Sequence, residues 1–265
     1  MLIHLIADYG PGDLAFAEVV QRIKRHLPDA EIMLTPVPSF STLAAGFCVA
    51  QLGLNDAPAG TLIFQNVAPR MDDPRARAGN AGERLAFARL TTGVRVIGVN
   101  AGYAFSFVRE GAEELRWVSV SAEGSQFRSR DLFPQALAEV TQGRAASLAE
   151  KIALEQIPEI PKNRIAYIDG YGNLKTTLDR GSLSFPPGAS LEVRIGKARR
   201  KVIVARASFD VPIGEMALAP GSSGWREASG KELRWMELFL RGGNAWETFD
   251  RPPVGASIEI EANPS

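Results

Sequence analysis

The sequence has little of the residue types that build metal sites and covalent cross-links. Cys48 is the one cysteine, so an internal disulfide or a thiolate metal cluster is impossible. The two histidines, His4 and His26, lie far along the chain from every candidate motif, which excludes a histidine-rich metal site. We therefore expect no metal and no cofactor, and we expect Cys48 to be a small buried residue in a reducing compartment.

The chain also lacks a long hydrophobic run and an excess of charge of either sign. The apolar start reaches Asp8 without the basic residues or the length of a signal peptide, and no later run approaches the roughly 18 apolar residues of a membrane span. Lys+Arg and Asp+Glu both number 30, so no surplus charge attracts phosphates. These absences predict a cytoplasmic protein with neither nucleic acid nor a membrane as a partner.

The organisation of the chain predicts two domains, because 265 residues exceed one ordinary small domain. Within 1–156, strand-like and helix-like runs alternate, which favours an α/β domain whose mostly parallel sheet is flanked by helices. The expected strands are 2–7, 31–34, 61–66 and 95–99, and the expected helices are 13–27, 41–54, 83–90 and a stretch around 148–155. Ligands of such sheets bind beyond the carboxyl ends of the strands, which draws attention to Asp8, Ala68 and Asn100.

The second part of the chain has a different pattern. An extended linker is expected at 157–162, where prolines alternate with isoleucines. Within 163–265, short alternating runs are separated by Gly, Pro and Ser, which predicts a small antiparallel sheet or β-barrel. The expected strands are 164–168, 190–195, 201–205, 233–240 and 257–261.

The first candidate site is the turn D-Y-G-P-G-D at 8–13, after the first strand. It lacks both the GxGxxG pattern and the lysine of a phosphate-binding loop, and its two carboxylates repel phosphate. A carboxylate accepts hydrogen bonds well from a ribose diol, so a nucleoside is favoured over a nucleotide. The alternative is purely structural, with Asp13 capping the following helix and Asp8 stabilising the turn.

Three further segments are weaker candidates when each is considered alone. The segment D-G-Y-G-N at 169–173 allows a close approach of backbone to a ligand, or it is simply a turn. The segment P-G-S-S-G-W at 220–225 offers hydroxyl groups to a carboxylate, or it is a loop. Phe40 has two interpretations: its ring stacks on a nucleoside base, or it packs in the core.

Taken together, these pieces resemble the S-adenosyl-methionine (SAM) hydroxide adenosyltransferase family, whose superfamily includes the fluorinase and the chlorinase. The resemblance runs over nearly the whole chain. Three short motifs lie in the first part of the chain: D-x-G-x-x-D at Asp8, Gly10 and Asp13, L-P-D-A-E-I at 27–32, and G-T at 60–61. Three longer motifs are similar to family patterns: F-R-S-R-D-L-F at 127–133 to F-H-G-R-D-x-F, Y-I-D-G-Y-G-N-L at 167–174 to Y-x-D-x-F-G-N-L, and G-S-S-G-W at 221–225 to G-S-S-G-Y. The last motif is G-N-A at 243–245.

The resemblance implies an α/β domain joined to a small β-barrel, in a homotrimer with ligand sites between subunits. For the nucleoside end, it implies that Asp8 holds the ribose hydroxyls, that Phe40 packs on the nucleoside, and that Asp13 and Asn100 belong to the substrate-binding set. The ligand partner is then a small nucleoside.

For the other end of the ligand, the resemblance implies residues of the second domain. Asp169 takes the methionine ammonium group, and Ser222 with Ser223 takes the carboxylate. Asn173 and the backbone around Asn244 read the adenine edge. A zwitterion needs both acceptors and donors, and these residues supply them.

The sequence departs from the family at the residues that activate water. The family's V-D-P-G-V-G-T-x-R becomes V-A-P-R-M-D-D-P-R at 67–75, so Ala68 replaces the aspartate and Arg75 keeps its place. Arg128 replaces the histidine, and Ser129 follows it. The catalytic set that the resemblance implies is therefore Arg75, Arg128 and Ser129, with Asp72 or Asp73 as a substitute base in a reshaped loop.

These observations leave several functions open. The first is hydrolysis of SAM to adenosine and methionine by displacement at C5′. The second is a catalytically silent protein that binds SAM or adenosine as a sensor or carrier, and a structural relic that binds nothing is a third. Halogenation is a further alternative, because halide needs no base, although Ala68 and Met71 replace the Tyr and Thr of the halide loop.

Overall fold

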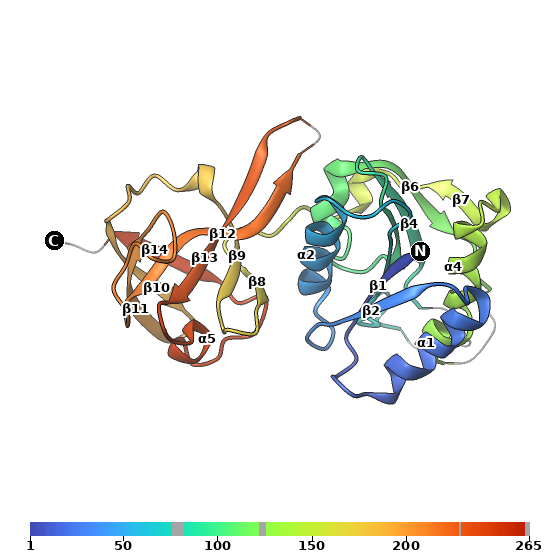
Figure 1. The fold of residues 1–265 in the computed structure, drawn as a ribbon, viewed down its shortest axis with the longest axis horizontal. Coiled ribbons are helices and arrows are strands. Elements are labelled where there is room, and N and C mark those ends of the chain that lie inside the picture. The colour runs from blue at the N-terminus through green and yellow to red at the C-terminus, as the bar shows by residue number, and fades with distance from the viewer. Residues whose placement is uncertain (76–81, 122–125, 228, 263–265) are drawn as a thin grey trace. The chain divides into compact units, whose positions relative to one another are not determined.

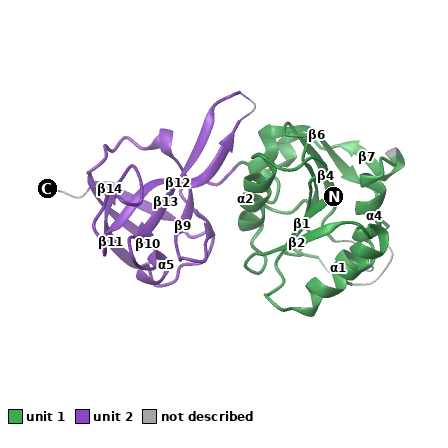
Figure 2. Cartoon of the chain, in the orientation of Figure 1, with its two compact units in different colours: residues 1–159 green, residues 160–265 purple. Residues whose placement is uncertain are grey.

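The computed structural model describes residues 1–75, 82–121, 126–227 and 229–262. The chain divides into two compact units, Met1–Glu159 and Ile160–Ser265 (Figure 2). The division lies inside the 157–162 segment, where the Pro-rich sequence favours extended backbone. Each unit has a hydrophobic core of its own.

Unit 1 is built from one sheet and the helices that cover it (Figure 1). Its strands and helices are, in chain order, β1 (Leu2–Ala7), α1 (Leu14–His26), β2 (Glu31–Pro36), α2 (Thr42–Gly53), β3 (Leu62–Asn66), β4 (Leu85–Leu90), β5 (Arg95–Val99), β6 (Ala112–Val118), α3 (Arg128–Asp131), α4 (Phe133–Thr141) and β7 (Leu148–Lys151), with 3-10 turns η1 (Ser106–Gly111), η2 (Ala145–Ser147) and η3 (Leu154–Gln156).

The seven-stranded sheet of unit 1 is mixed, in the order β2-β1-β3-β5-β4-β6-β7. Strand β1 pairs in parallel with β2 and β3, and β3 pairs in parallel with β5. The pairs β5–β4, β4–β6 and β6–β7 are antiparallel. The expectation of a mostly parallel sheet therefore holds for the first half of the sheet and not for the second.

Two predicted helices are wrong, and both lie in the antiparallel half. Within 83–90, residues Leu85–Leu90 form β4 rather than a helix. Apart from the exposed Arg89, L-A-F-A-R-L is a short apolar run that is buried on both faces of the sheet, and periodicity alone does not separate such a run from a buried helix. A tight turn at Gly93, whose φ is +82°, then returns the chain into β5. The stretch around 148–155 forms β7 and η3.

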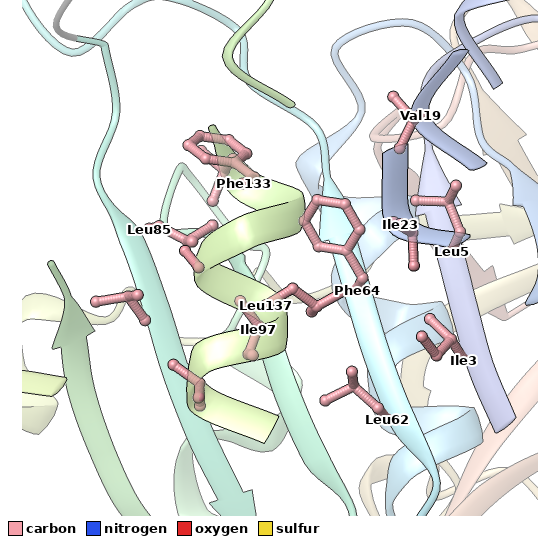
Figure 3. Close-up of a cluster of buried hydrophobic side chains, with 14 of the residues drawn as sticks. Ile3, Leu5, Val19, Ile23, Leu62, Phe64, Leu85, Ile97, Phe133 and Leu137 are labelled. Atoms are coloured by element: carbon pink, nitrogen blue, oxygen red, sulfur yellow. The ribbon is translucent and has the colours of Figure 1, made fainter. Parts of the chain in front are cut away.

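Helices cover both faces of this sheet. On one face, α1 and α4 pack their apolar sides against the strands, and Phe64 meets Phe133 edge-on at 6.5 Å between ring centroids (Figure 3). On the other face, α2 packs against η1 through Phe47 and Phe107. The core therefore holds the strand ends of β1, β3 and β5 in fixed positions.

Unit 2 is a seven-stranded sheet that curls into a half-barrel. Its elements are β8 (Ile165–Ile168), β9 (Leu174–Asp179), η4 (Arg180–Ser182), β10 (Ser190–Ile195), β11 (Ala198–Val204), β12 (Met216–Arg226), β13 (Glu232–Leu240), α5 (Ala245–Thr248) and β14 (Ile258–Ala262). The order is β14-β10-β11-β12-β13-β9-β8, and β11–β12 is its parallel pair. A bridge between Arg164 and Ser257 links the two ends of the sheet.

The expected strands of unit 2 are present, but β9 and β12 were not predicted. Strand β12 contains Pro220, Gly221 and Gly224, residues that indicate a loop, and the structure accommodates them with a bulge between Pro220 and Gly224. Within the described residues, no helix combines the length and the apolar character that crossing a membrane requires.

Candidate functional site

A pocket of about 490 Å³ lies in unit 1 at the carboxyl ends of β1, β3 and β5. This is the position at which parallel strands place their ligand-binding loops. The described residues that line the pocket are Asp8, Tyr9, Ser39, Phe40, Asn66, Ala68, Arg70, Gly82, Glu83, Val99, Gln126, Phe127, Arg128, Ser129 and Phe133. Segments that are far apart in the sequence therefore meet here.

Asp8 holds the loop that carries Phe40. The Phe40 amide donates a hydrogen bond of 2.8 Å to Asp8 Oδ2, and Phe40 has a φ of +60°, which is unusual for a bulky residue. Its ring is 61% exposed. Arg70, also in the pocket, has a φ of +60° as well. Strained backbone of this kind concentrates at ligand-binding and catalytic sites.

A hydrogen-bonded chain of three side chains forms the floor of the pocket. Asn66 Nδ2 donates to the Tyr9 hydroxyl at 2.7 Å, and that hydroxyl lies 2.8 Å from Ser129 Oγ. Asn66 and Ser129 are both buried. Burial, and to a smaller extent the negative charges of Asp8 and Asp13, raise the pKa of Tyr9 to about 12. The phenol is therefore neutral at physiological pH.

Opposite charges meet at another wall of the pocket. Glu83 is only 8% exposed, and its Oε1 accepts a 3.2 Å hydrogen bond from the Met71 amide. An Arg128 terminal nitrogen lies 3.5 Å from the Glu83 backbone oxygen, and the guanidinium group lies 5.2 Å from the centre of the Phe133 ring. Burial lowers the pKa of Arg128, and the Glu83 charge opposes that shift.

The pocket contains Asp8, Phe40, Ala68, Arg128 and Ser129 of the predicted site residues. Their roles toward a ligand stay predictions. Ala68 brings no ionisable group, so the position of the family aspartate offers nothing to activate water.

Three predicted residues of unit 1 do not line this pocket. Asp13 caps α1, with its Oδ1 accepting from the Ala15 amide at 2.8 Å, which is the structural alternative that its position allowed. Arg75 is 86% exposed and pairs with Asp73 at 3.2 Å. Asn100 follows β5, and its amide bonds to the Arg84 carbonyl.

A second pocket, of about 630 Å³, lies within unit 2. Among the predicted residues, it includes Asn173 and Ser222. Its wall also carries two exposed aromatic rings, Tyr171 and Phe209, and the guanidinium group of Arg241 lies 5.2 Å from the Phe209 ring centre. These flat apolar surfaces beside polar groups are what a heteroaromatic base requires.

The Asp169 carboxylate already accepts several hydrogen bonds from the chain itself. Its Oδ1 accepts from the amides of Tyr171 (2.9 Å) and Asn173 (3.0 Å), and its Oδ2 accepts from Asn173 Nδ2 at 3.0 Å. Lys175 Nζ lies 3.6 Å from Asp169 Oδ2 and 3.1 Å from Glu237 Oε2. The register explains this arrangement, because Lys175 and Glu237 are direct partners on β9 and β13.

This network places the chain's own ammonium group beside the aspartate that the resemblance assigns to the ammonium group of methionine. The three side chains are 12–19% exposed, so water screens them only partly. An ammonium group bound at Asp169 would share this carboxylate with Lys175, which would weaken its binding.

The remaining predicted residues of unit 2 have clear structural surroundings. Ser223 is buried and does not line the pocket. Asn244 Oδ1 accepts from the Glu247 amide at 2.9 Å and caps α5. A Cβ at Gly172, whose φ is +79°, would collide with the Asn244 side chain, so this glycine allows the 169–173 loop to lie against α5.

Sequence reasoning missed Tyr9, Asn66 and Glu83 in the first pocket, and Lys175 and Glu237 beside Asp169. Asn66 is the last residue of β3 and Tyr9 is the second residue after β1, and such positions at strand ends are a signal that the sequence contains. Glu83 had no such signal, because its segment was assigned to a helix. Among the described residues, no group of three His, Cys, Asp or Glu side chains is arranged to hold a metal ion.

The comparisons with known proteins find a family similarity in the second unit. Residues 163–253 match the model of the SAM hydroxide adenosyltransferase C-terminal domain. Most of unit 2 is therefore similar to that domain. This confirms the family resemblance for the second unit, and the matched range contains the motifs at 167–174, 221–225 and 243–245. None of the curated proteins matches the chain.

Solved structures resemble nearly the whole chain, including unit 1. An uncharacterized conserved protein from Thermotoga maritima has a TM-score of 0.75 and 21% identity, covering 98% of this chain and 100% of its own. A conserved hypothetical protein from Thermus thermophilus has a TM-score of 0.68 and 20% identity, covering 98% of this chain and 99% of its own. At these identities the likeness shows the fold.

Proposed function

We propose that this protein binds SAM and hydrolyses it to adenosine and methionine by displacement at C5′. The observation that carries the proposal is the pocket of unit 1. Asp8, Phe40, Ala68, Arg128 and Ser129 are spread over more than a hundred residues of sequence, yet they line one cavity of about 490 Å³. The match of residues 163–253 to a SAM hydroxide adenosyltransferase domain supports SAM as the ligand.

The chemistry suits a nucleoside with a good leaving group. In the proposed complex, the Asp8 carboxylate accepts hydrogen bonds from the ribose hydroxyls, and the exposed Phe40 ring packs on the nucleoside. Water then attacks C5′ opposite to the sulfur, the C5′–S bond breaks, and its electron pair leaves with sulfur as the neutral thioether of methionine. Positioning alone supplies a large part of the rate of such an in-line displacement.

A catalytically silent binding protein is the second candidate. The observation that favours it is the loss of the water-activating groups from the pocket: Ala68 has no carboxylate, and Arg75 is exposed and paired with Asp73. Halogenation is a further candidate, because the guanidinium groups of Arg70 and Arg128 both border the pocket and favour an anion.

We further propose, from the family resemblance, that the protein is a cytoplasmic homotrimer in which each ligand is shared between subunits. The division of the predicted ligand residues between units 1 and 2 supports this proposal. Light scattering of the purified protein should give three times the chain mass of 28.6 kDa. A mass that stays at 28.6 kDa over a range of concentrations would refute the trimer.

The test of function is to incubate the purified protein with SAM, with and without chloride, and to resolve the products by chromatography and mass spectrometry. Adenosine supports hydrolysis, and 5′-chloro-5′-deoxyadenosine supports halogenation. Intact SAM that co-elutes with the protein supports silent binding. If no product forms and no SAM is retained, the proposal is refuted. Arg128→Ala should reduce turnover, whereas Arg89→Gln, at an exposed arginine of β4, is the matched control.

A further inference from the structure

The pocket of unit 1 contains a carboxylate that the sequence motifs do not mark. We propose that Glu83 is the general base that takes the proton from the attacking water, in place of the family aspartate that Ala68 has replaced. The inference rests on the proposed hydrolysis and names the residue that the proposal otherwise lacks.

The position of Glu83 meets the requirements of a base. It lines the pocket and is only 8% exposed, so it is held rather than free in solvent. The Met71 amide fixes Oε1, and no hydrogen bond from the described residues engages Oε2. One oxygen therefore positions the side chain while the other is available to a water molecule.

Arg128 provides the cationic partner for this reaction. Its terminal nitrogen lies 3.5 Å from the Glu83 backbone oxygen, and within the described residues its buried Nε has no hydrogen-bond partner. In the proposed complex, this guanidinium group and the Glu83 carboxylate, which line the same pocket, orient a water molecule between them. Arg128 stands at the position of the family's water-activating histidine, and Glu83 lies against that position.

The other carboxylates near the pocket are less suitable. Asp8 is the second carboxylate among the described lining residues, and it receives the Phe40 amide at the end assigned to ribose. Asp73 is tied to the exposed Arg75, and Asp72 is exposed and does not line the pocket. Glu83 is thus the described lining residue that combines a buried carboxylate with a backbone contact to Arg128.

The step balances without a further reactant. The water oxygen forms a bond to C5′, its proton moves to Glu83 Oε2, and the C5′–S electron pair leaves with sulfur. Adenosine and neutral-thioether methionine are released, and Glu83 then returns the proton to solvent. One proton is produced for each SAM consumed.

Glu83→Gln tests the proposal, because a glutamine retains an acceptor for the Met71 amide but cannot take a proton. We expect SAM affinity, measured by calorimetry, to stay within about threefold of wild type, while kcat falls by about 10²–10⁴-fold. Glu113→Gln, at an exposed glutamate of β6, is the matched control and should retain full activity.

The pH–rate profile separates a base from a structural residue. In the wild type, Glu83 takes the proton, so kcat should not rise with the hydroxide concentration above neutral pH. In Glu83→Gln, the residual rate should rise about tenfold per pH unit, because hydroxide needs no base. A variant that keeps the wild-type kcat, or that loses SAM binding along with turnover, overturns the assignment.

Two further results would also overturn the assignment of Glu83. They show whether the assignment alone fails or the proposed hydrolysis fails with it. If Asp72→Asn loses turnover while Glu83→Gln keeps it, hydrolysis stands and the base lies elsewhere. If the wild type forms no adenosine from SAM, the proposed hydrolysis itself is refuted, and the role of Glu83 as its base with it.

Discussion

At the residue scale, Asp8 connects two segments that lie 32 positions apart. Its Oδ2 accepts from the Phe40 amide and stabilises a positive φ, and the same carboxylate faces the pocket. Such a side chain affects both loop geometry and ligand binding, so a variant must separate the two effects.

Asp8→Asn should achieve that separation, because the amide oxygen still accepts from Phe40 while the negative charge is lost. Hydrogen bonds to charged groups contribute about 1.5–3 kcal/mol, so we expect adenosine to bind about 10- to 100-fold more weakly with an unchanged melting temperature. Calorimetric titration with adenosine checks this. Glu31→Gln, at an exposed glutamate of β2, serves as the control, and equal affinity in Asp8→Asn would contradict the ribose assignment.

Tyr9 should make stability depend on pH in the alkaline range. Its pKa is raised from 10.0 to about 12 in the folded protein, so the folded state keeps a proton that the unfolded state loses. The stabilisation is present below pH 10 and is lost as the pH rises from 10 to 12. Between these values, the free energy of unfolding of Tyr9→Phe should fall less steeply than that of wild type, by up to about 1.4 kcal/mol per pH unit.

Urea denaturation at pH 9, 10 and 11 measures this difference, and absorbance at 295 nm follows tyrosine ionisation directly. Tyr171, which is exposed, gives the matched variant Tyr171→Phe and should leave the slope unchanged. Identical slopes in wild type and Tyr9→Phe would show that the folded state does not suppress ionisation of this phenol.

At the element scale, the pairing of β9 with β13 decides what the Asp169 site can accept. Lys175 sits between Asp169 and Glu237, with Nζ distances of 3.6 and 3.1 Å. A partly buried ion network of this kind is costly to break on one side, because the remaining charges lose their partner.

Lys175→Met should therefore destabilise the protein by about 3–5 kcal/mol in the absence of ligand and free the two carboxylates for an external ammonium group. We expect SAM to raise the melting temperature of Lys175→Met more than that of wild type, and adenosine, which lacks that ammonium group, to raise both equally. Thermal denaturation with each ligand is the measurement, with the exposed Lys151→Met as control. A SAM effect that is the same in both proteins would place the methionine end elsewhere.

The elements also show what the sequence could and could not predict. The strands β1, β3 and β5 and the helices α1 and α2 were predicted, because their periodicity and caps are local signals. Residues 83–90 were assigned to a helix, since a run buried on both faces has no alternation, and this error hid Glu83. Its approach to Arg128, 45 residues later, follows from tertiary packing that no local pattern records.

At the scale of the whole molecule, the predicted ligand residues are divided between two units with separate cores. Unit 1 contains the acidic and arginine side chains of the proposed reaction centre, and unit 2 contains the region that is similar to the SAM hydroxide adenosyltransferase C-terminal domain. The hydrolysis proposed above transfers the adenosyl group of SAM to water and forms adenosine and methionine in equal amounts.

Turnover in water labelled with ¹⁸O tests this requirement most directly. Attack at C5′ by water places the label in the 5′-oxygen of adenosine and leaves methionine unlabelled. We predict labelled adenosine and methionine in a one-to-one ratio, analysed by mass spectrometry. Unlabelled products or cleavage of SAM at another bond would contradict hydrolysis at C5′. Quantitative recovery of SAM after incubation with the protein would contradict it as well.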